Sequence, residues 1–222
     1  MLHLISYTTI MRIIIITLLL LAINTTAAQD FKGFVNIQKI DSTITVELMY
    51  AKPDNFVGEK MYDFKEAYLH PKAAEALKKA NKILKEINPN LHLHIYDAAR
   101  PMRVQQKMWN RVKGTAQQNY VSNPANGGGL HNYGLAVDAS IANNNGDTLT
   151  MGTTIDALTY TSHIDREEEL VKQGKITKEA AKNRLLLRTI MRKAGFRPLR
   201  SEWWHFNYTT RADARKNYKV IP

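Results

Sequence analysis

The sequence of 222 residues contains no cysteine. This absence excludes a disulfide framework, thiolate chemistry and a lipid anchor attached to cysteine. A bound metal ion would therefore have to be held by nitrogen and oxygen atoms. Internal repeats and low-complexity tracts are also missing, which excludes solenoid architectures. With 44% hydrophobic residues, the chain is long enough for one domain with a core and too short for two full ones.

Acidic residues are the minority: 20 Asp and Glu stand against 31 Lys and Arg, for a formal charge of +11. Such an excess favours either an anionic partner or a solvated basic surface. Basic residues are spread over segments of helical pattern, with glutamates among them, and no basic strip is interleaved with aromatics. We therefore expect a solvated surface and no nucleic-acid partner. A weak affinity for cell wall or membrane is the alternative.

The N-terminus has the order of a secretory signal: Arg12, an apolar run at 13–23, then small residues at 25–28. We expect a signal peptide at 1–28, cleaved after Ala28, and a domain at 29–222. The apolar run is short for a membrane span, so an uncleaved anchor is the lesser alternative. This predicts a periplasmic or secreted protein with no integral membrane span after signal removal.

Hydrophobic periodicity predicts alternating helices and strands that are not arranged as a doubly wound fold. Apolar residues at helical spacing predict helices over 71–87, 101–112 and 177–192, and alternation predicts strands over 43–49, 91–96, 135–138 and 203–208. Residues 119–129 are rich in Asn, Pro and Gly and predict a loop. The order of these elements indicates an α+β domain.

Four polar residues combine into a predicted metal hydrolase site. Singly, each is more often a surface or core residue. Together, His131, Asp138 and His205 supply two imidazoles and a carboxylate, which leaves a fourth tetrahedral position for water. Glu202, three residues before His205, can lean over the metal as a general base without being a ligand. Gly134 lies between the first two ligands, where a small residue allows close approach of the backbone.

These residues resemble the zinc D-alanyl-D-alanine dipeptidase family, which is related to D-Ala-D-Ala carboxypeptidases and to the hedgehog fold. The similarity lies in His-x-x-Gly-x-Ala-x-Asp at 131–138 and Glu-x-x-His at 202–205, and extends to segments 50–58, 97–101 and 151–156. It covers nearly the whole chain after about residue 34. It implies a single α+β domain, in which a small antiparallel sheet carries the metal site and helices pack around it.

The resemblance implies hydrolysis of the D-alanyl-D-alanine dipeptide to two D-alanines, with one Zn²⁺ per chain. Zinc is favoured, although other divalent metals suit two histidines and an aspartate nearly as well. Glu202 would take a proton from the metal-bound water and pass it to the departing amine. Arg100 matches the arginine that stabilises the oxyanion; its alternative is a salt bridge to Asp97. Tyr50 and Asp156 match the positions that bind the substrate ammonium.

The sequence departs from the family where the substrate carboxylate is bound. Gly129 stands where the family has a serine whose hydroxyl helps bind this carboxylate, and Ala99 replaces a frequent tyrosine. The backbone amides of 127–129 form a candidate anion nest in its place, as a hypothesis.

Two other functions remain as alternatives. The first is a D,D-carboxypeptidase or endopeptidase that trims peptidoglycan stem peptides. The ammonium-binding pair argues against it, because a longer substrate has no ammonium at that position. The second is a non-catalytic zinc-binding domain, against which Glu202 argues, since a structural site needs no base.

Several residues with tempting chemistry receive no site role. His92 and His94 share one face of a predicted strand, and we expect them to be solvent-facing or hydrogen-bonded. His163 is assigned no catalytic role. Trp203 and Trp204 are candidates to line the pocket, although neighbours on a strand point to opposite faces, so one of them should pack inward.

Overall fold

The computed structural model describes residues 30–222, so the predicted signal peptide at 1–28 lies outside the described residues. Residues 33–222 form one unit, and this unit is the α+β domain that the sequence predicts. Within residues 30–222, no helix combines the length and the apolar character that a membrane crossing requires.

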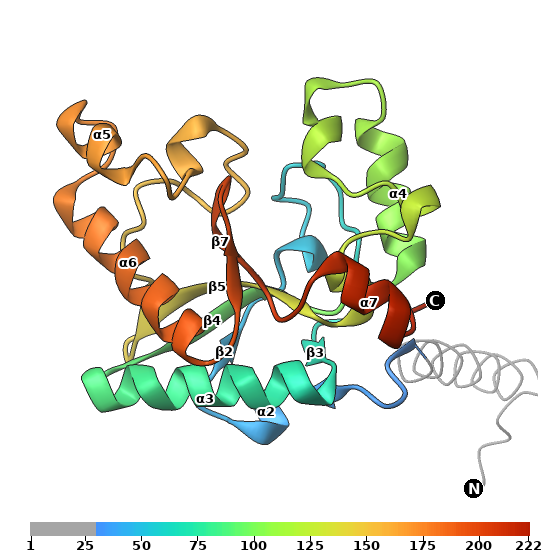
Figure 1. Cartoon of the computed structure of the whole chain (residues 1–222), viewed down its shortest axis with the longest axis horizontal. Coiled ribbons are helices and arrows are strands. Elements are labelled where there is room, and N and C mark those ends of the chain that lie inside the picture. The colour runs from blue at the N-terminus through green and yellow to red at the C-terminus, as the bar shows by residue number, and fades with distance from the viewer. Residues whose placement is uncertain (1–29) are drawn as a thin grey trace, which may run out of the picture. The chain divides into compact units, whose positions relative to one another are not determined.

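A five-stranded sheet forms the centre of the domain (Figure 1). Its strands, in spatial order, are β2 (Thr45–Val46), β4 (Leu91–Asp97), β5 (Ala136–Asn143), β7 (Glu202–Asn207) and β6 (Arg197–Leu199). All neighbours are antiparallel except β2 and β4, which are parallel. The predicted antiparallel sheet is therefore confirmed apart from one edge strand. A second antiparallel pair joins β1 (Val35–Asn36) to β3 (Tyr68–Leu69).

The predicted helices are present at nearly the expected bounds. The α-helices are α2 (Ile37–Ile40), α3 (Pro71–Ile87), α4 (Met102–Val112), α5 (Glu167–Lys172), α6 (Lys178–Lys193) and α7 (Arg211–Asn217). The predicted loop at 119–129 contains only short turns of 3₁₀ helix. The 3₁₀ segments are η1 (Met49–Ala51), η2 (Ala116–Tyr120), η3 (Pro124–Asn126), η4 (Leu130–Tyr133) and η5 (Tyr160–Ser162).

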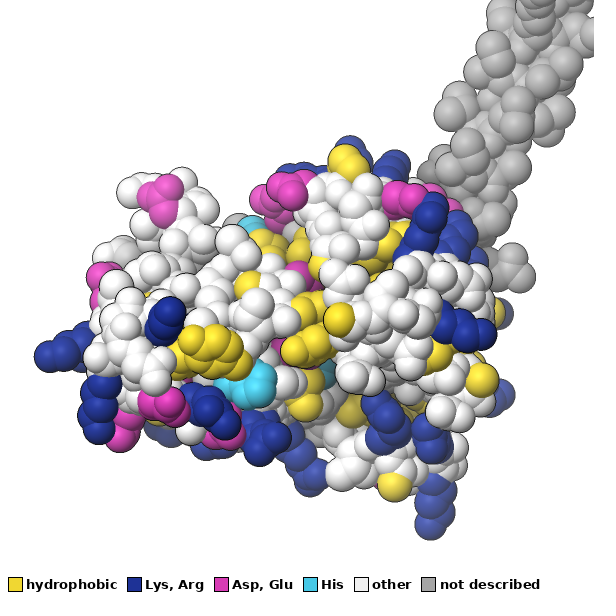
Figure 2. Space-filling view, turned by 90° about the horizontal axis from the view of Figure 1, so that it is seen from above, with side chains coloured by type: hydrophobic (Ala, Val, Ile, Leu, Met, Phe, Trp, Pro, Cys, Tyr) yellow, Lys and Arg dark blue, Asp and Glu magenta, His cyan; other side chains and the backbone are white. Residues whose placement is uncertain are grey.

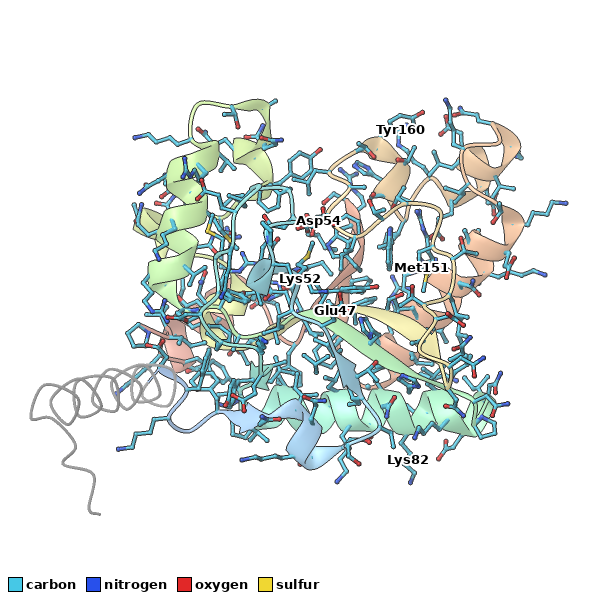
Figure 3. The ribbon with its side chains drawn as sticks, turned by 180° about the vertical axis from the view of Figure 1, so that it is seen from behind. Glu47, Lys52, Asp54, Lys82, Met151 and Tyr160 are labelled. Atoms are coloured by element: carbon cyan, nitrogen blue, oxygen red, sulfur yellow. The ribbon has the colours of Figure 1, made fainter. Side chains whose placement is uncertain are left out.

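Local signals explain where the two long helices begin. Pro71 takes the first position of α3, and the His70 side chain accepts a hydrogen bond from the backbone of the first turn. Thr177 Oγ1 accepts from the backbone N–H of Ala180 at 3.0 Å and caps α6. Helix α3 packs against β4 and α6, and Lys82 projects from its outer side (Figure 3). The two helices thus support the sheet that carries the site.

Two expectations about the β2–β4 region need correction. The regular part of the predicted strand 43–49 is only β2, because the chain turns into η1 after Leu48. Glu47 and Lys52, which pair with each other, flank this turn (Figure 3). His92 and His94 are not solvent-facing: they are 7% and 8% exposed. His94 is hydrogen-bonded as expected, since its Nδ1 lies 2.8 Å from Thr45 Oγ1.

Candidate active site

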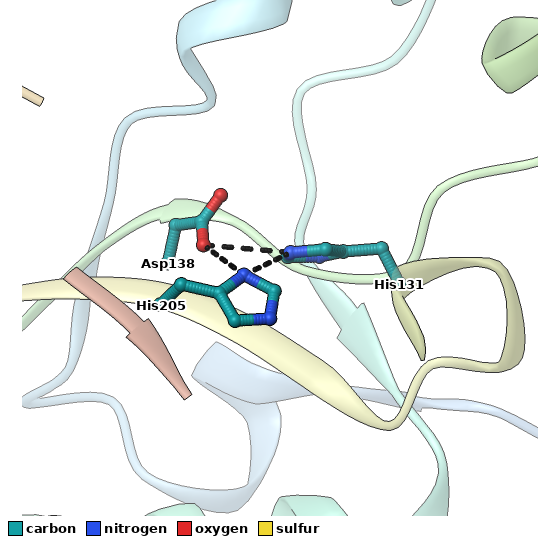
Figure 4. A group of neighbouring side chains, drawn as sticks. All are labelled: His131, Asp138 and His205. Carbon is teal, nitrogen blue, oxygen red and sulfur yellow. Dashed lines mark hydrogen bonds and ion pairs between the residues drawn. The ribbon is translucent and has the colours of Figure 1, made fainter. Parts of the chain in front are cut away.

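Three predicted ligands converge at the middle of the sheet (Figure 4). His131 Nε2 lies 3.2 Å from His205 Nδ1 and 3.4 Å from Asp138 Oδ1. The third side of this triangle, from His205 Nδ1 to Asp138 Oδ1, is 3.0 Å long. The three donor atoms therefore face a common centre, although His131 and His205 are 74 residues apart in the chain.

Sheet register accounts for most of this convergence. Asp138 on β5 is paired directly with His205 on β7, and Asp97 at the end of β4 is paired with Asp138. His131 comes from η4, the 3₁₀ turn that leads into β5. Gly134 ends this turn in the left-handed region, with φ 63°. A β-carbon there would lie 2.5 Å from the Phe34 ring, so the close approach that Gly134 permits is to protein atoms, not to the metal centre.

The far ring nitrogens of both histidines have acceptors. His131 Nδ1 lies 2.6 Å from the carbonyl oxygen of Ala98, and His205 Nε2 lies 2.9 Å from Asn207 Oδ1. Each far nitrogen faces an oxygen acceptor, so with a metal ion at the centre it is the far nitrogen that would carry the proton of the neutral ring. The nitrogens that face the centre then keep free lone pairs. Such partners orient metal-binding histidines and fix their tautomers.

The donor set fits a tetrahedral divalent metal ion. Metal–ligand distances of about 2.0–2.1 Å place the ligand atoms of a tetrahedral centre about 3.3 Å apart. The three observed separations, 3.0, 3.2 and 3.4 Å, bracket this value. His131 and Asp138 are buried, with 6% and 3% of their surfaces exposed. Because the Asp138 carboxylate is thereby removed from water, a positively charged ion at the centre would stabilise it.

Glu202 lies beside the triangle without belonging to it. Its Oε2 is 4.0 Å from His205 Nδ1. Residues three apart on a regular strand point to opposite faces, but the pairing of β6 with β7 is irregular between Pro198 and Leu199. Such a bulge re-aims side chains, and it lets Glu202 and His205 face the same space. Burial raises the pKa of Glu202, against the lowering effect of His205.

The two alternatives that the sequence leaves open for Arg100, a salt bridge to Asp97 and a place beside the candidate metal site, are not exclusive. Its guanidinium forms a buried salt bridge to Asp97 at 2.5 Å, and it also lines the cavity beside the metal centre. One further nitrogen donates to Gln105 Oε1 at 3.0 Å, and the guanidinium lies 5.0 Å from the centre of the Tyr50 ring. These contacts hold the cation in one orientation. Asp97 Oδ2 also lies 3.5 Å from His131 Nδ1, so it connects Arg100 to the metal centre.

Tyr50 and Asp156 form the second predicted pair. Tyr50, at η1, donates its hydroxyl hydrogen to Asp156 Oδ2 at 2.7 Å. Asp156 has φ 56°, the only positive φ outside glycine among residues 30–222, and such backbone conformations concentrate at functional sites. Burial raises the pKa of Asp156 to about 7; the charge of Asp138 adds to this rise and the Tyr50 hydrogen bond opposes it.

A cavity of about 300 Å³ joins all seven predicted residues. Figure 2 shows the face of the domain above the sheet, where most Lys, Arg, Asp and Glu side chains lie around the rim and hydrophobic side chains and a histidine lie towards the middle. Helix α4 and the η5 loop rise on either side of β7 (Figure 1). Trp203 and Trp204 do not line this cavity: both are packed in the core, and Trp203 Nε1 donates to Thr153 Oγ1.

Sequence reasoning missed several polar residues that line the cavity: Gln105, Ser122, Arg197, Asn207 and Arg211. They come from a helix, a loop, two strands and the start of α7, and no local spacing relates them. Two signals in the sequence could have found some of them. Asn207 lies two residues after His205, so both share one face of a strand, and the lack of a hydroxyl at Gly129 suggests that another residue supplies one.

The proposed anion nest at 127–129 is contradicted by the structure. The backbone N–H of Gly127 donates to the Pro124 carbonyl, and that of Gly128 donates to the Asn123 carbonyl. The third amide, of Gly129, donates to Asn132 Oδ1 at 2.8 Å. All three donors are thus used to close the turn, and none is directed at a ligand.

Comparisons with known proteins agree with the geometry. A family model described as D-ala-D-ala dipeptidase, of a metallopeptidase family, matches residues 30–221. The D-alanyl-D-alanine dipeptidase of Escherichia coli (strain K12) is 33% identical over 177 residues, which cover 80% of this chain and 85% of that protein. A D-alanyl-D-alanine dipeptidase of Synechocystis sp. is 28% identical over 160 residues, or 59% of this chain and 65% of that protein.

Proposed function

The chain belongs to the D-Ala-D-Ala dipeptidase family of metallopeptidases, and on this premise we propose that it hydrolyses the D-alanyl-D-alanine dipeptide to two molecules of D-alanine with one Zn²⁺ held by His131, Asp138 and His205. The observation that carries this proposal is the placement of Glu202, 4.0 Å from a ligand atom and outside the ligand set. A purely structural site needs no such carboxylate.

A zinc ion bound by these ligands would supply a Lewis acid that polarises the peptide carbonyl and lowers the pKa of water. Glu202 accepts the proton of the attacking water as the water oxygen bonds to the carbonyl carbon. It then delivers this proton to the departing amino group as the C–N bond breaks. The raised pKa of Glu202 suits both transfers, because a proton carrier works best near the operating pH.

Arg100 has the second role in the transition state. Attack on the carbonyl places a negative charge on its oxygen, and a planar guanidinium fixed by Asp97 and Gln105 can stabilise that charge without reorganising. Because Arg100 is held before substrate arrives, the cost of orienting it is met by folding. We therefore assign it to oxyanion stabilisation.

We assign binding of the dipeptide's ammonium group to the Asp156 carboxylate, which Tyr50 orients through a hydrogen bond. Tyr50 is buried and Asp156 is half-buried, and both line the same cavity as the candidate metal ligands. A cavity of about 300 Å³ lies at the small end of ligand-binding pockets, which favours a dipeptide over a longer chain. A stem peptide has an amide in place of the ammonium and would leave Asp156 without its charged partner.

Hydrolysis of D-Ala-D-Ala by the purified domain tests this function, with an N-acylated peptide ending in D-Ala-D-Ala assayed in parallel. We expect D-alanine release from the dipeptide alone, abolished by a chelator and restored by Zn²⁺. The Glu202→Gln variant should retain zinc and lose hydrolysis, whereas Glu179→Gln, on the exposed start of α6, serves as the matched control. Cleavage of the acylated peptide would assign the chain to carboxypeptidases or endopeptidases. Zinc binding without cleavage of either substrate would identify a non-catalytic domain.

We propose further that the protein is exported through the signal peptide at 1–28 and acts in the periplasm or outside the cell on products of the cell wall. The basic charge spread around the rim of the face in Figure 2 supports a solvated surface with at most weak association with the wall. Fractionation of cells expressing the full chain tests export: the mature form should begin at Gln29.

A further inference from the structure

Gly129 leaves a space in the cavity that another residue has filled. A β-carbon on Gly129 would lie 2.9 Å from Ser122 Oγ and 3.3 Å from Ser122 Cβ. The backbone at Gly129 has φ −105° and ψ 179°, which any residue can adopt. Glycine is therefore not required by the backbone; the hydroxymethyl group of Ser122 occupies the position that a side chain at 129 would take.

Ser122 is held there by two contacts from different elements. An Arg211 guanidinium nitrogen donates to Ser122 Oγ at 3.1 Å, and Gln105 Nε2 donates to the Ser122 carbonyl at 2.8 Å. Gln105 also accepts from Arg100, so the cation beside the metal centre and Ser122 share one support. Because the Ser122 oxygen accepts from Arg211, its own hydrogen is free to be donated to an anion.

Arg211 brings a positive charge to the same place. It lines the cavity together with Ser122, and no carboxylate within residues 30–222 forms an ion pair with it. The cavity therefore has Asp156 for a cationic group, and it has Arg211 with a hydroxyl for an anionic one. Charge-assisted hydrogen bonds from a guanidinium and a hydroxyl are suited to a carboxylate.

We propose that Ser122 and Arg211 bind the substrate's terminal carboxylate, and that the Ser122 hydroxyl takes the place of the hydroxyl that is missing at Gly129. The inference rests on the proposed dipeptidase function. It deepens that function by assigning the carboxylate end to residues from the 121–123 loop and α7. Substrates that carry a free carboxylate should therefore be preferred over otherwise identical amides.

Steady-state kinetics with D-Ala-D-Ala and D-Ala-D-alaninamide test the assignment. We expect Ser122→Ala and Arg211→Gln each to raise KM for the dipeptide by roughly 10- to 100-fold with little change in kcat, and to leave the amide almost unaffected. The matched control is Arg215→Gln, because Arg215 lies on the same helix, contacts the Asn126 carbonyl and does not line the cavity. A variant that only loosened the fold would affect both substrates equally.

A swap of the hydroxyl between the two positions provides a rescue. Gly129→Ser alone should raise KM for the dipeptide, since its β-carbon meets Ser122. Adding Ser122→Gly removes this clash and returns a hydroxyl to nearly the same place, so the double variant should regain most of the lost affinity. Failure of the double variant to improve on Gly129→Ser would contradict the idea that the two side chains occupy one site.

The outcomes for this inference and for the dipeptidase function can be told apart. If the wild-type protein cleaves the dipeptide and the amide equally well, or if both variants alter the two substrates alike, Ser122 and Arg211 do not bind the carboxylate. If the wild-type protein cleaves neither, the dipeptidase function fails, and calorimetric titration of D-Ala-D-Ala into zinc-loaded protein decides the inference. Weaker binding to Arg211→Gln supports it, and equal or absent binding overturns it.

Discussion

The Tyr50 hydroxyl donates to Asp156 Oδ2 at 2.7 Å, a contact that joins residues 106 positions apart. Tyr50 is buried and belongs to the η1 turn, whereas Asp156 is held at φ 56°. The hydrogen bond aims a carboxylate into the cavity and leaves its other oxygen for a ligand. We expect the protonation state of this carboxylate to determine how substrate binding and stability depend on pH.

Binding of the dipeptide should weaken in acid. The pKa of Asp156 is raised to about 7, mainly by burial and then by Asp138, with Glu202 adding to the rise and Tyr50 and Arg100 opposing it. Below pH 7 Asp156 gains a proton and loses the charge that we propose attracts the ammonium. KM for D-Ala-D-Ala should therefore rise about tenfold per pH unit as pH falls below 7 and stay level above it.

Replacement of Asp156 by Asn checks the source of this dependence. The variant should raise KM by about 100-fold at pH 8 and flatten the pH profile of KM. Asp54→Asn, on the exposed segment after η1 (Figure 3), should leave the profile unchanged. A pH dependence that persists in Asp156→Asn would assign it to another group.

The same substitution should stabilise the metal-free protein. A folded pKa of about 7 against an ordinary 3.8 means that the folded state favours the protonated form of Asp156. Protonation of Asp156 therefore stabilises the folded state fully below pH 3.8, and this stabilisation is lost as pH rises through 7. At pH 8 the ionised side chain destabilises the folded state. Asp156→Asn should then raise the free energy of unfolding by about 1–3 kcal/mol.

Thermal unfolding at pH 8 and pH 5 separates charge from backbone effects in this variant. The gain due to charge should shrink at pH 5, where Asp156 is already protonated in the folded state. Asn also tolerates the left-handed region well, and any gain from this cause is independent of pH. A stability gain that is identical at the two pH values would show that the charge of Asp156 has no cost.

Arg100 should affect turnover more than binding. In Arg100→Lys the ammonium cannot hold Asp97 and Gln105 while facing the substrate, because it lacks the planar fork of the guanidinium. We expect kcat to fall by about 100-fold with KM changed little, as for loss of a group that acts in the transition state. Arg103→Lys, a change at a half-buried α4 residue that pairs with Asp63 and does not line the cavity, should retain full activity. A rise in KM at constant kcat would instead assign Arg100 to substrate binding.

Asn207 should determine how tightly the metal is held. Its Oδ1 accepts from His205 Nε2 at 2.9 Å, so Asn207→Ala removes the group that orients this ring. Zinc affinity measured by equilibrium dialysis should fall about 10- to 100-fold, and Asn207→Asp should preserve it. Asn217→Ala, in which an exposed contact to Asp213 is lost, provides the control. An unchanged affinity in Asn207→Ala would mean that β7 alone orients His205.

The long helices were predictable because their signals are local. Pro71 and Thr177 mark where α3 and α6 begin, and apolar residues at helical spacing define the faces that they bury. The length of the strand at 43–49 was not predictable in this way. This edge strand pairs with β4 alone, and its last backbone hydrogen bond to β4, from the Glu47 N–H to the Ile95 carbonyl, comes just before the chain forms η1.

The candidate metal ligands and the four other predicted residues of the cavity could be located from the sequence, whereas its remaining polar residues could not. His131, Asp138 and His205 have a chemistry that is informative even before their positions are known. Ser122 and Arg211 are ordinary loop and helix residues, and their meeting depends on how η2, η3 and α7 pack. The nest at 127–129 was wrong for a related reason: the sequence does not reveal that the turn itself uses these amides.

Because Asp138 is paired directly with His205, metal binding depends on the correct register between β5 and β7. A slip of β7 by one residue against β5 would turn His205 to the opposite face and bring Trp204 or Phe206 opposite Asp138. Such a misaligned chain would contain every ligand and still lack the triangle that they form. Tight zinc binding by refolded protein would therefore report the correct pairing of β5 and β7 before any substrate is added.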